Sequence, residues 1–285
     1  MRRALRFGLP VALALVWNAP ARAAEHAHAE AGAMASEHQG DRPVASPAAQ
    51  RAPRAPVDAS EVVYATVAGR PVRGFLARPQ GAEPHPGIVV IHEWWGLNDN
   101  IRQLTRQLAG EGYVALAVDL YGGEVASDPD AAMALMQAAG ERAAELQDNL
   151  RAAHRFLAEQ QHVTRSGVIG WCFGGGWALQ DALAQGGKPD AVVMYYGRVE
   201  TDPARLAPLS APLLGLFAGR DRSIPPEQVR AFQDALAKLG KPAEIHVYEG
   251  ADHAFANPSG TRYQPEAARD AWQRTLAFLA RTLAR

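Results

Sequence analysis

The sequence predicts an α/β fold, a doubly wound and mostly parallel sheet with helices on both faces. From about residue 87 onward, short runs rich in β-branched residues alternate with longer stretches of helical period. Some runs are apolar throughout, as in Gly87-Ile88-Val89-Val90-Ile91, which is typical of a strand buried on both faces. Strands separated by helices of this length form parallel crossover units.

The predicted elements begin with a hairpin, because residues 62–67 and 72–77 alternate in polarity around a turn at Gly69. The further expected strands are 87–91, 113–120, 167–171, 191–196, 212–218 and 243–248. The expected helices are one ending near Gly110 with Ile101, Leu104 and Leu108 on its apolar face, one long helical stretch over 129–160, one over 226–239 and one from residue 265. A single domain over residues 57–285 contains them all.

Residues 1–23 are typical of a secretory signal peptide. A basic start precedes a short apolar run over residues 8–17, and Ala21-Arg22-Ala23 forms a small-x-small cleavage site. We therefore expect an exported protein, periplasmic or secreted after cleavage near Ala23. The apolar run is shorter than the roughly 20 residues that a bilayer span needs, so no stable membrane span is expected.

Residues 24–56 are rich in alanine, histidine and proline and lack a hydrophobic period, so they predict a disordered linker. Its histidines at 26, 28 and 38 could hold a metal loosely, but they lack the spacing of a closed site and no metal site is predicted. After residue 23, 25 basic and 30 acidic side chains remain. This balance gives no reason to expect a nucleic acid as partner, and a small molecule is the expected partner.

The most specific motif is Gly170-Trp171-Cys172-Phe173-Gly174, at the point where a strand ends and a helix begins. A nucleophile on such a strand-to-helix turn needs very small residues two positions before and after it, and glycine occupies both. The positive end of the following helix favours a thiolate. Cys172 is also the only cysteine, so it cannot form an internal disulfide. The competing interpretation is an inert buried thiol.

The partners that an acyl-transfer site needs follow in the order nucleophile, acid, base. Asp221 comes after the strand at 212–218 and His253 after the strand at 243–248. Each alone could be an ordinary loop residue, but with the turn at Cys172 they predict a Cys-His-Asp triad on an α/β-hydrolase fold. Asp252 adjoins His253 in sequence and is poorly placed to reach its ring. The backbone N-H groups of Phe173 and Trp94 are the expected oxyanion donors.

Residues 61–285 resemble the dienelactone hydrolase family. The resemblance rests on His92-Glu93-Trp94-Trp95-Gly96, Asp119-Leu120-Tyr121, Gly170-Trp171-Cys172-Phe173-Gly174-Gly175, Gly219-Arg220-Asp221 and His253-Ala254-Phe255. It implies Cys172, Asp221 and His253 as the triad, and Glu93 as the glutamate that accepts the thiol proton until substrate arrives. An ordinary solvated or salt-bridged loop carboxylate is the alternative for Glu93.

The chain departs from this family where the substrate carboxylate is bound. Dienelactone-cleaving members use two arginines, yet residues 122–140 contain no lysine or arginine, and Asn257 occupies the position after His253-Ala254-Phe255-Ala256. An uncharged or differently placed ester is therefore favoured. Arg220, Arg222 and Arg262 could supply the charge, although solvation at the surface is favoured for each. The expected substrate-binding residues are Trp94, Trp95, Tyr121, Trp171, Phe255 and Asn257, with core packing an equal alternative for Trp95 and Trp171.

The leading functional hypothesis is a cofactor-free hydrolase that cleaves a small ester or lactone through a thioester on Cys172. A peptidase or amide hydrolase on the same fold is one alternative. A non-catalytic module that uses its thiol for binding or sensing is another, and metal handling through the N-terminal histidines is a third.

Overall fold

The protein is described by a computed structural model, which covers residues 38–44, 46–81, 83–184 and 189–283. The predicted signal peptide and the first part of the predicted linker, with His26 and His28, lie outside these residues. No helix in the described part of the chain is long and apolar enough to cross a membrane.

Eight strands form one sheet in the order β1-β2-β4-β3-β5-β6-β7-β8. The strands are β1 (Val57–Val67), β2 (Arg70–Pro79), β3 (Gly87–Ile91), β4 (Val114–Val118), β5 (Ser166–Trp171), β6 (Ala191–Tyr195), β7 (Leu213–Ala218) and β8 (Ala243–Tyr248). The pairs β1-β2 and β2-β4 are antiparallel, and every other pair is parallel. The predicted fold class is confirmed.

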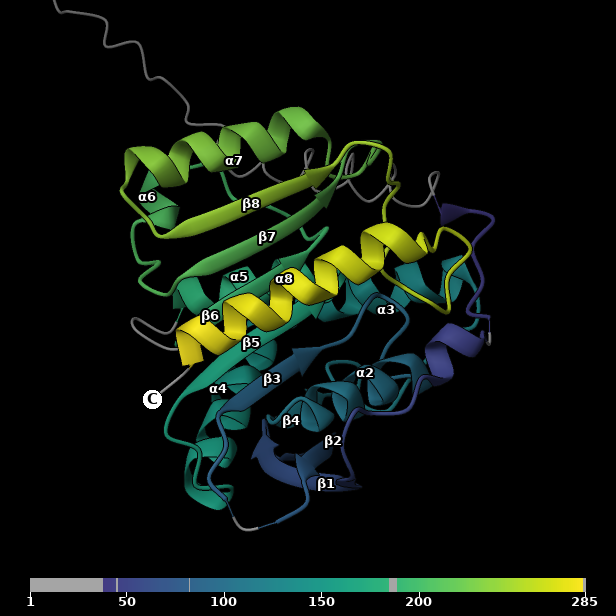
Figure 1. The fold of residues 1–285 in the computed structure, drawn as a ribbon, viewed down its shortest axis with the longest axis vertical. Coiled ribbons are helices and arrows are strands. Elements are labelled where there is room, and N and C mark those ends of the chain that lie inside the picture. The colour runs from purple at the N-terminus through teal and green to yellow at the C-terminus, as the bar shows by residue number, and fades with distance from the viewer. Residues whose placement is uncertain (1–37, 45, 82, 185–188, 284–285) are drawn as a thin grey trace, which may run out of the picture.

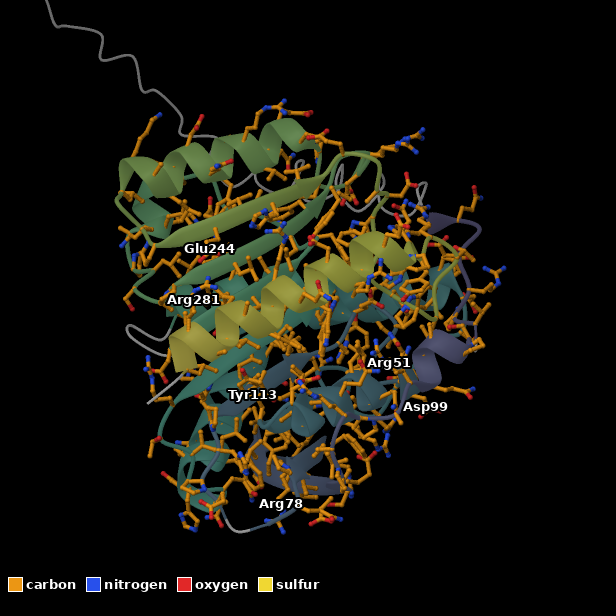
Figure 2. All side chains as sticks on the ribbon, viewed as in Figure 1. Arg51, Arg78, Asp99, Tyr113, Glu244 and Arg281 are labelled. Atoms are coloured by element: carbon orange, nitrogen blue, oxygen red, sulfur yellow. The ribbon has the colours of Figure 1, made fainter. Side chains whose placement is uncertain are left out.

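The helical elements are η1 (Pro47–Gln50), α2 (Asp99–Gly110), α3 (Pro129–Glu141), α4 (Ala143–Gln160), α5 (Phe173–Ala184), α6 (Pro203–Leu206), α7 (Pro226–Lys238) and α8 (Pro265–Leu283). Figure 1 shows α8 crossing in front of the central strands, with α4 and α5 behind them. An ion pair between Arg281 and Glu244, with Nη2 and Oε1 2.5 Å apart, links α8 to β8 (Figure 2).

Two hydrophobic cores lie on the two faces of the sheet. Side chains alternate along β3, so that Ile88 and Val90 join the core covered by α2 and α8, while Val89 and Ile91 join the core covered by α4, α5 and α7. All five residues of β3 are buried, as its continuous apolar run predicts. Because the strands from β3 to β8 run parallel to one another, their carboxyl ends all lie at one edge of the sheet. The loops at that edge are where an α/β fold binds its ligands.

The prediction of one long helical stretch over residues 129–160 was wrong in one respect, because two helices, α3 and α4, occupy these residues. The chain breaks at Arg142, whose φ of −106° and ψ of 29° lie outside the helical range. Gly140 lies just before the break and weakens the helix by about 1 kcal/mol relative to alanine. Sequence periodicity continues across the break and so did not reveal it.

The second half of the predicted linker also differs from expectation. The N-terminal segment, which we define as residues 38–44 and 46–56, packs on the domain and includes the turn η1. The N-H of Val44 donates to the carbonyl of Ser259 at 2.7 Å, and the Ser46 hydroxyl donates to the carbonyl of Pro258 at 2.5 Å. These partners lie more than 200 residues away in sequence, which is why local composition did not predict an ordered path.

Candidate active site

The turn between β5 and α5 places Cys172 at the carboxyl edge of the sheet. Cys172 has a φ of +54°, in the left-handed region that side chains rarely adopt. A Cβ on Gly170 would lie 2.0 Å from the carbonyl oxygen of Gly174, and a Cβ on Gly174 would lie 2.4 Å from that of Ile91. Both positions therefore require glycine, and the strained backbone projects the buried thiol beyond the sheet edge.

Asp221 holds the ring of His253. The Nδ1 of His253 donates to Oδ2 of Asp221 at 2.7 Å. The other carboxylate oxygen, Oδ1, accepts from the N-H of Ser223 at 2.9 Å, from the Ser223 hydroxyl at 2.8 Å and from the N-H of Ile224 at 2.8 Å. Burial alone would raise the pKa of Asp221, but the charge of His253 and these hydrogen bonds hold the pKa below its usual value.

The ring of His253 is poised for proton transfer. Burial lowers its pKa, yet the Asp221 carboxylate and the sulfur of Cys172 raise that pKa well above the ordinary value. Nε2, on the side of the ring away from Asp221, is buried and is left to interact with the sulfur of Cys172. His253 and Cys172 line the same small cavity. A proton moving between the thiol and Nε2 would thus create a pair of opposite charges that Asp221 stabilises.

Glu93 is the second buried carboxyl group of the cavity. The Nδ2 of Asn257 donates to its Oε2 at 2.5 Å, and the hydroxyl of Tyr196 donates to its Oε1 at 3.3 Å. Burial raises the pKa of Glu93 to about 7, because the charge of His253 and these two hydrogen bonds offset only part of the cost of burying a carboxylate. Glu93 can therefore hold or release a proton near neutral pH.

The two expected oxyanion donors lie beside the thiol. Phe173 is the first residue of α5, where a backbone N-H has no acceptor within the helix, whereas the N-H of Cys172 itself donates to the carbonyl of Tyr195 at 3.0 Å. Trp94 follows β3 and lines the cavity with Cys172. The two backbone N-H groups therefore stay the predicted oxyanion donors.

The cavity is small. Its volume is about 10 Å³, the space of roughly one water molecule. Of the residues predicted to bind substrate, Trp94, Trp95 and Asn257 line it. The lining also includes His38, Asp41 and Arg42 of the N-terminal segment, Ala254, and the loop residues Gly260, Thr261 and Arg262.

The other predicted substrate-binding residues are not among those that line this cavity. Phe255 is fully buried and packs against Tyr196 and Tyr248, with ring centroids 5.4 and 4.9 Å away. Tyr121 packs against Phe173 and the ring of His92, and its buried hydroxyl is close enough to Cys172 for the sulfur to help raise the pKa of Tyr121. Trp171 lines a separate cavity of about 560 Å³.

Of the three arginines that could replace the family's carboxylate-binding arginines, only one lines the small cavity. Arg262 lines the small cavity, with its Nε 3.6 Å from Oδ1 of Asp41, whereas Arg220 and Arg222 are not among the lining residues.

Sequence reasoning missed several members of this site. Tyr196 directly follows β6, so its place at the carboxyl edge was available as a signal, and Ser223 is two residues from Asp221. His38 and Asp41 gave no such signal, because they precede the domain in a stretch without hydrophobic period. The structure places the ring of His38 with its centroid 4.9 Å from that of His253 and 5.1 Å from that of Trp94.

Comparisons with known proteins agree on the family. The model of the dienelactone hydrolase family matches residues 72–283. A protein named "Putative carboxymethylenebutenolidase" from Saccharolobus solfataricus is 34% identical over 252 residues, which cover 75% of this chain and 95% of that protein. A protein with the same name from Escherichia coli K12 is 32% identical over 266 residues, covering 85% of this chain and 95% of that protein.

A solved structure shows the same architecture. The crystal structure of a "Putative Dienelactone Hydrolase" from Klebsiella pneumoniae is 31% identical in sequence; the match covers 79% of this chain and 99% of that chain and has a TM-score of 0.71. The chain therefore belongs to the dienelactone hydrolase family of the α/β-hydrolase superfamily and is a dienelactone hydrolase-like hydrolase.

Proposed function

We propose that this protein hydrolyses a small ester or lactone with Cys172 as nucleophile, His253 as base and Asp221 as the residue that orients the base. The observation that carries the proposal is the position of His253, which is bonded to Asp221 through Nδ1 and shares a small cavity with the thiol. A buried thiol that served packing alone would need neither the strained turn nor this neighbour.

The reaction would proceed in two halves. Nε2 of His253 takes the proton of Cys172, and the sulfur attacks the carbonyl carbon, whose oxygen becomes an oxyanion bonded by the N-H groups of Phe173 and Trp94. The intermediate collapses to a thioester as the alkoxide leaves with the proton from His253. Water then gives its proton to His253 and attacks the thioester, and the acid departs as the thiolate is regenerated.

Glu93 would accept a hydrogen bond from the neutral thiol before substrate arrives, until the proton passes to His253. A carboxylate whose pKa is about 7 is basic enough for this role, and burial among Tyr196, Asn257 and Trp94 keeps water from competing. The same arrangement protects a neutral thiol from oxidation, because the thiolate is the reactive form. Asn257 helps to position Glu93 in this role through its hydrogen bond to Oε2.

The substrate we propose is small and need not carry a carboxylate. The relatives named for carboxymethylenebutenolidase activity suggest a lactone, but Asn257 here donates to Glu93 and occupies the position where the family's arginine is expected. The small cavity volume favours short acyl groups or compact rings.

The test is hydrolysis of a panel of aryl esters, lactones and amides by the purified protein, with a chelator present. We expect turnover of short-chain esters or lactones, a lower rate on amides, and loss of turnover in Cys172→Ala. Cys172 is the only thiol, so the thioester can be trapped by acid quench and located by mass spectrometry. Wild-type turnover in a folded Cys172→Ala protein would refute the proposal.

We also propose export to the periplasm or the exterior, on the pattern of residues 1–23. The amino-terminal sequence of the protein recovered from its native host should begin close to Glu25. A protein that retains Met1 and stays in the cytosol would contradict this.

A further inference from the structure

A second histidine with its own carboxylate lies at the active site. The Nδ1 of His38 is 2.6 Å from Oδ2 of Asp41, and only 2% of the His38 surface is exposed. Its ring contacts the rings of His253 and Trp94. Neither residue belongs to the segment that the family model matches, which begins at residue 72.

Several bonds fix the position of Asp41. Its Oδ1 accepts from the hydroxyl of Thr261 at 2.7 Å and lies 3.6 Å from Nε of Arg262. Burial raises the pKa of Asp41, but the hydrogen bonds from His38 and Thr261 hold that pKa below its usual value, so the carboxylate is ionised and can only accept. The proton between the two residues is therefore on Nδ1 of His38.

The remaining nitrogen of His38, Nε2, has no hydrogen-bond partner among the residues that the structure describes. Burial, together with the charge of His253, lowers the pKa of His38, so the ring is neutral at neutral pH. In a neutral ring protonated on Nδ1, Nε2 is an acceptor. That atom is buried, and no described residue bonds to it, although His38 lines the cavity over Cys172. A buried acceptor without a donor is costly, and a ligand with a hydroxyl or N-H group would satisfy it.

We propose that His38 is a specificity-determining residue, which walls the cavity so that only small acyl groups reach Cys172 and whose Nε2 accepts a hydrogen bond from a hydroxyl on the substrate. The inference rests on the proposed function for its substrate class, namely short hydroxyacyl esters or hydroxylated lactones. Its steric part depends only on access to the thiol. The remaining length of the N-terminal segment holds this wall against residues 258–262.

Two substrate pairs separate the two parts of the proposal. Hexanoyl and acetyl esters of one phenol test the wall, and hydroxyacetyl and propionyl esters test the acceptor at nearly constant size. In His38→Ala, we expect the ratio of kcat/KM for hexanoyl over acetyl to rise at least about tenfold, because one methylene in a fitted pocket already changes the rate by that much. We expect the ratio for hydroxyacetyl over propionyl to fall roughly five- to tenfold, the loss of one hydrogen bond.

His38→Phe keeps a ring of similar size and removes the acceptor. It should retain the preference for acetyl over hexanoyl and lose the preference for hydroxyacetyl. His85→Ala is the matched control, since His85 precedes β3 at the opposite edge of the sheet, and it should leave both ratios unchanged. If both kcat/KM ratios stay unchanged in His38→Ala, because the four esters change rate equally or not at all, the proposal is overturned.

Alkylation of Cys172 gives a readout that does not require turnover. The full-length protein has one thiol, so the rates with iodoacetamide and with the bulkier N-phenylmaleimide report access to the cavity. His38→Ala should accelerate the bulky reagent several-fold more than the small one, and an equal change would refute the wall. If no ester or lactone is hydrolysed but the labelling ratio changes as expected, the proposed function fails while the steric part of this inference stands.

Discussion

Replacement of Glu93 by glutamine should change how stability depends on pH. The pKa of Glu93 is about 7 in the folded protein against an ordinary value of 4.5. A folded-state pKa above the unfolded one means that the protonated carboxyl group stabilises the fold below pH 4.5, and that this contribution is lost as the pH rises through 7. At 1.36 kcal/mol for each unit of difference, the loss amounts to about 3 kcal/mol.

Glutamine does not titrate, so Glu93→Gln removes this loss. Its amide group also turns an NH2 donor toward one of the two donors on Asn257 and Tyr196, a mismatch that costs about 1 kcal/mol and does not itself titrate. The free energy of unfolding of the variant minus that of the wild type should therefore increase by about 3 kcal/mol between pH 4 and pH 8.5, whatever its starting value.

The assay is urea denaturation at intervals of half a pH unit, followed by tryptophan fluorescence. The exposed Glu124 provides the matched control, because Glu124→Gln makes the same change in formal charge at the surface. After subtraction of the control, a difference that is flat with pH or falls as pH rises would refute the assignment of the raised pKa to burial of Glu93.

Three further predictions concern the site. Asp221→Asn should lower kcat on the order of 10³- to 10⁴-fold with little change in KM, because the amide no longer favours the required tautomer of His253; a loss below tenfold would contradict the triad. Tyr196→Phe should raise the pKa of Glu93 and move the acid limb of the kcat/KM profile upward by up to about one pH unit, and a downward shift would contradict this. Gly174→Ala should destabilise the protein by about 3 kcal/mol in urea titrations, because its Cβ would lie 2.4 Å from the Ile91 carbonyl; Gly140→Ala, in open space on α3, should instead stabilise by up to about 1 kcal/mol.

The fold was largely predictable because its signals are local. Each buried parallel strand is a continuous apolar run, as in Gly87–Ile91, and the glycines around Cys172 mark the turn between β5 and α5. The break at Arg142 was not predictable from the hydrophobic pattern, since α3 and α4 both contribute apolar residues on either side of it.

That the site residues lie close together was partly predictable, because local signals place each of them at the end of a strand. Asp221 and His253 follow strands whose carboxyl ends share one edge, so topology alone suggests that they meet, and the structure joins them at 2.7 Å. The raised pKa of Glu93 depends on how completely the chain covers it, which no local pattern encodes. His38 reaches the cavity through bonds to residues more than 200 positions away, and its short polar stretch resembles any other linker.

The path of the N-terminal segment affects how recombinant forms of this enzyme should be designed. A version trimmed to begin at Val57 would keep the whole sheet, the residues that the family model matches, and Cys172, Asp221 and His253. It would nevertheless remove part of the cavity lining, because His38, Asp41 and Arg42 would be gone. Substrate profiles measured on such a shortened protein would be those of a cavity without this part of its lining. An affinity tag fused close to residue 38 carries the same risk. Tags belong at the carboxyl terminus, beyond α8.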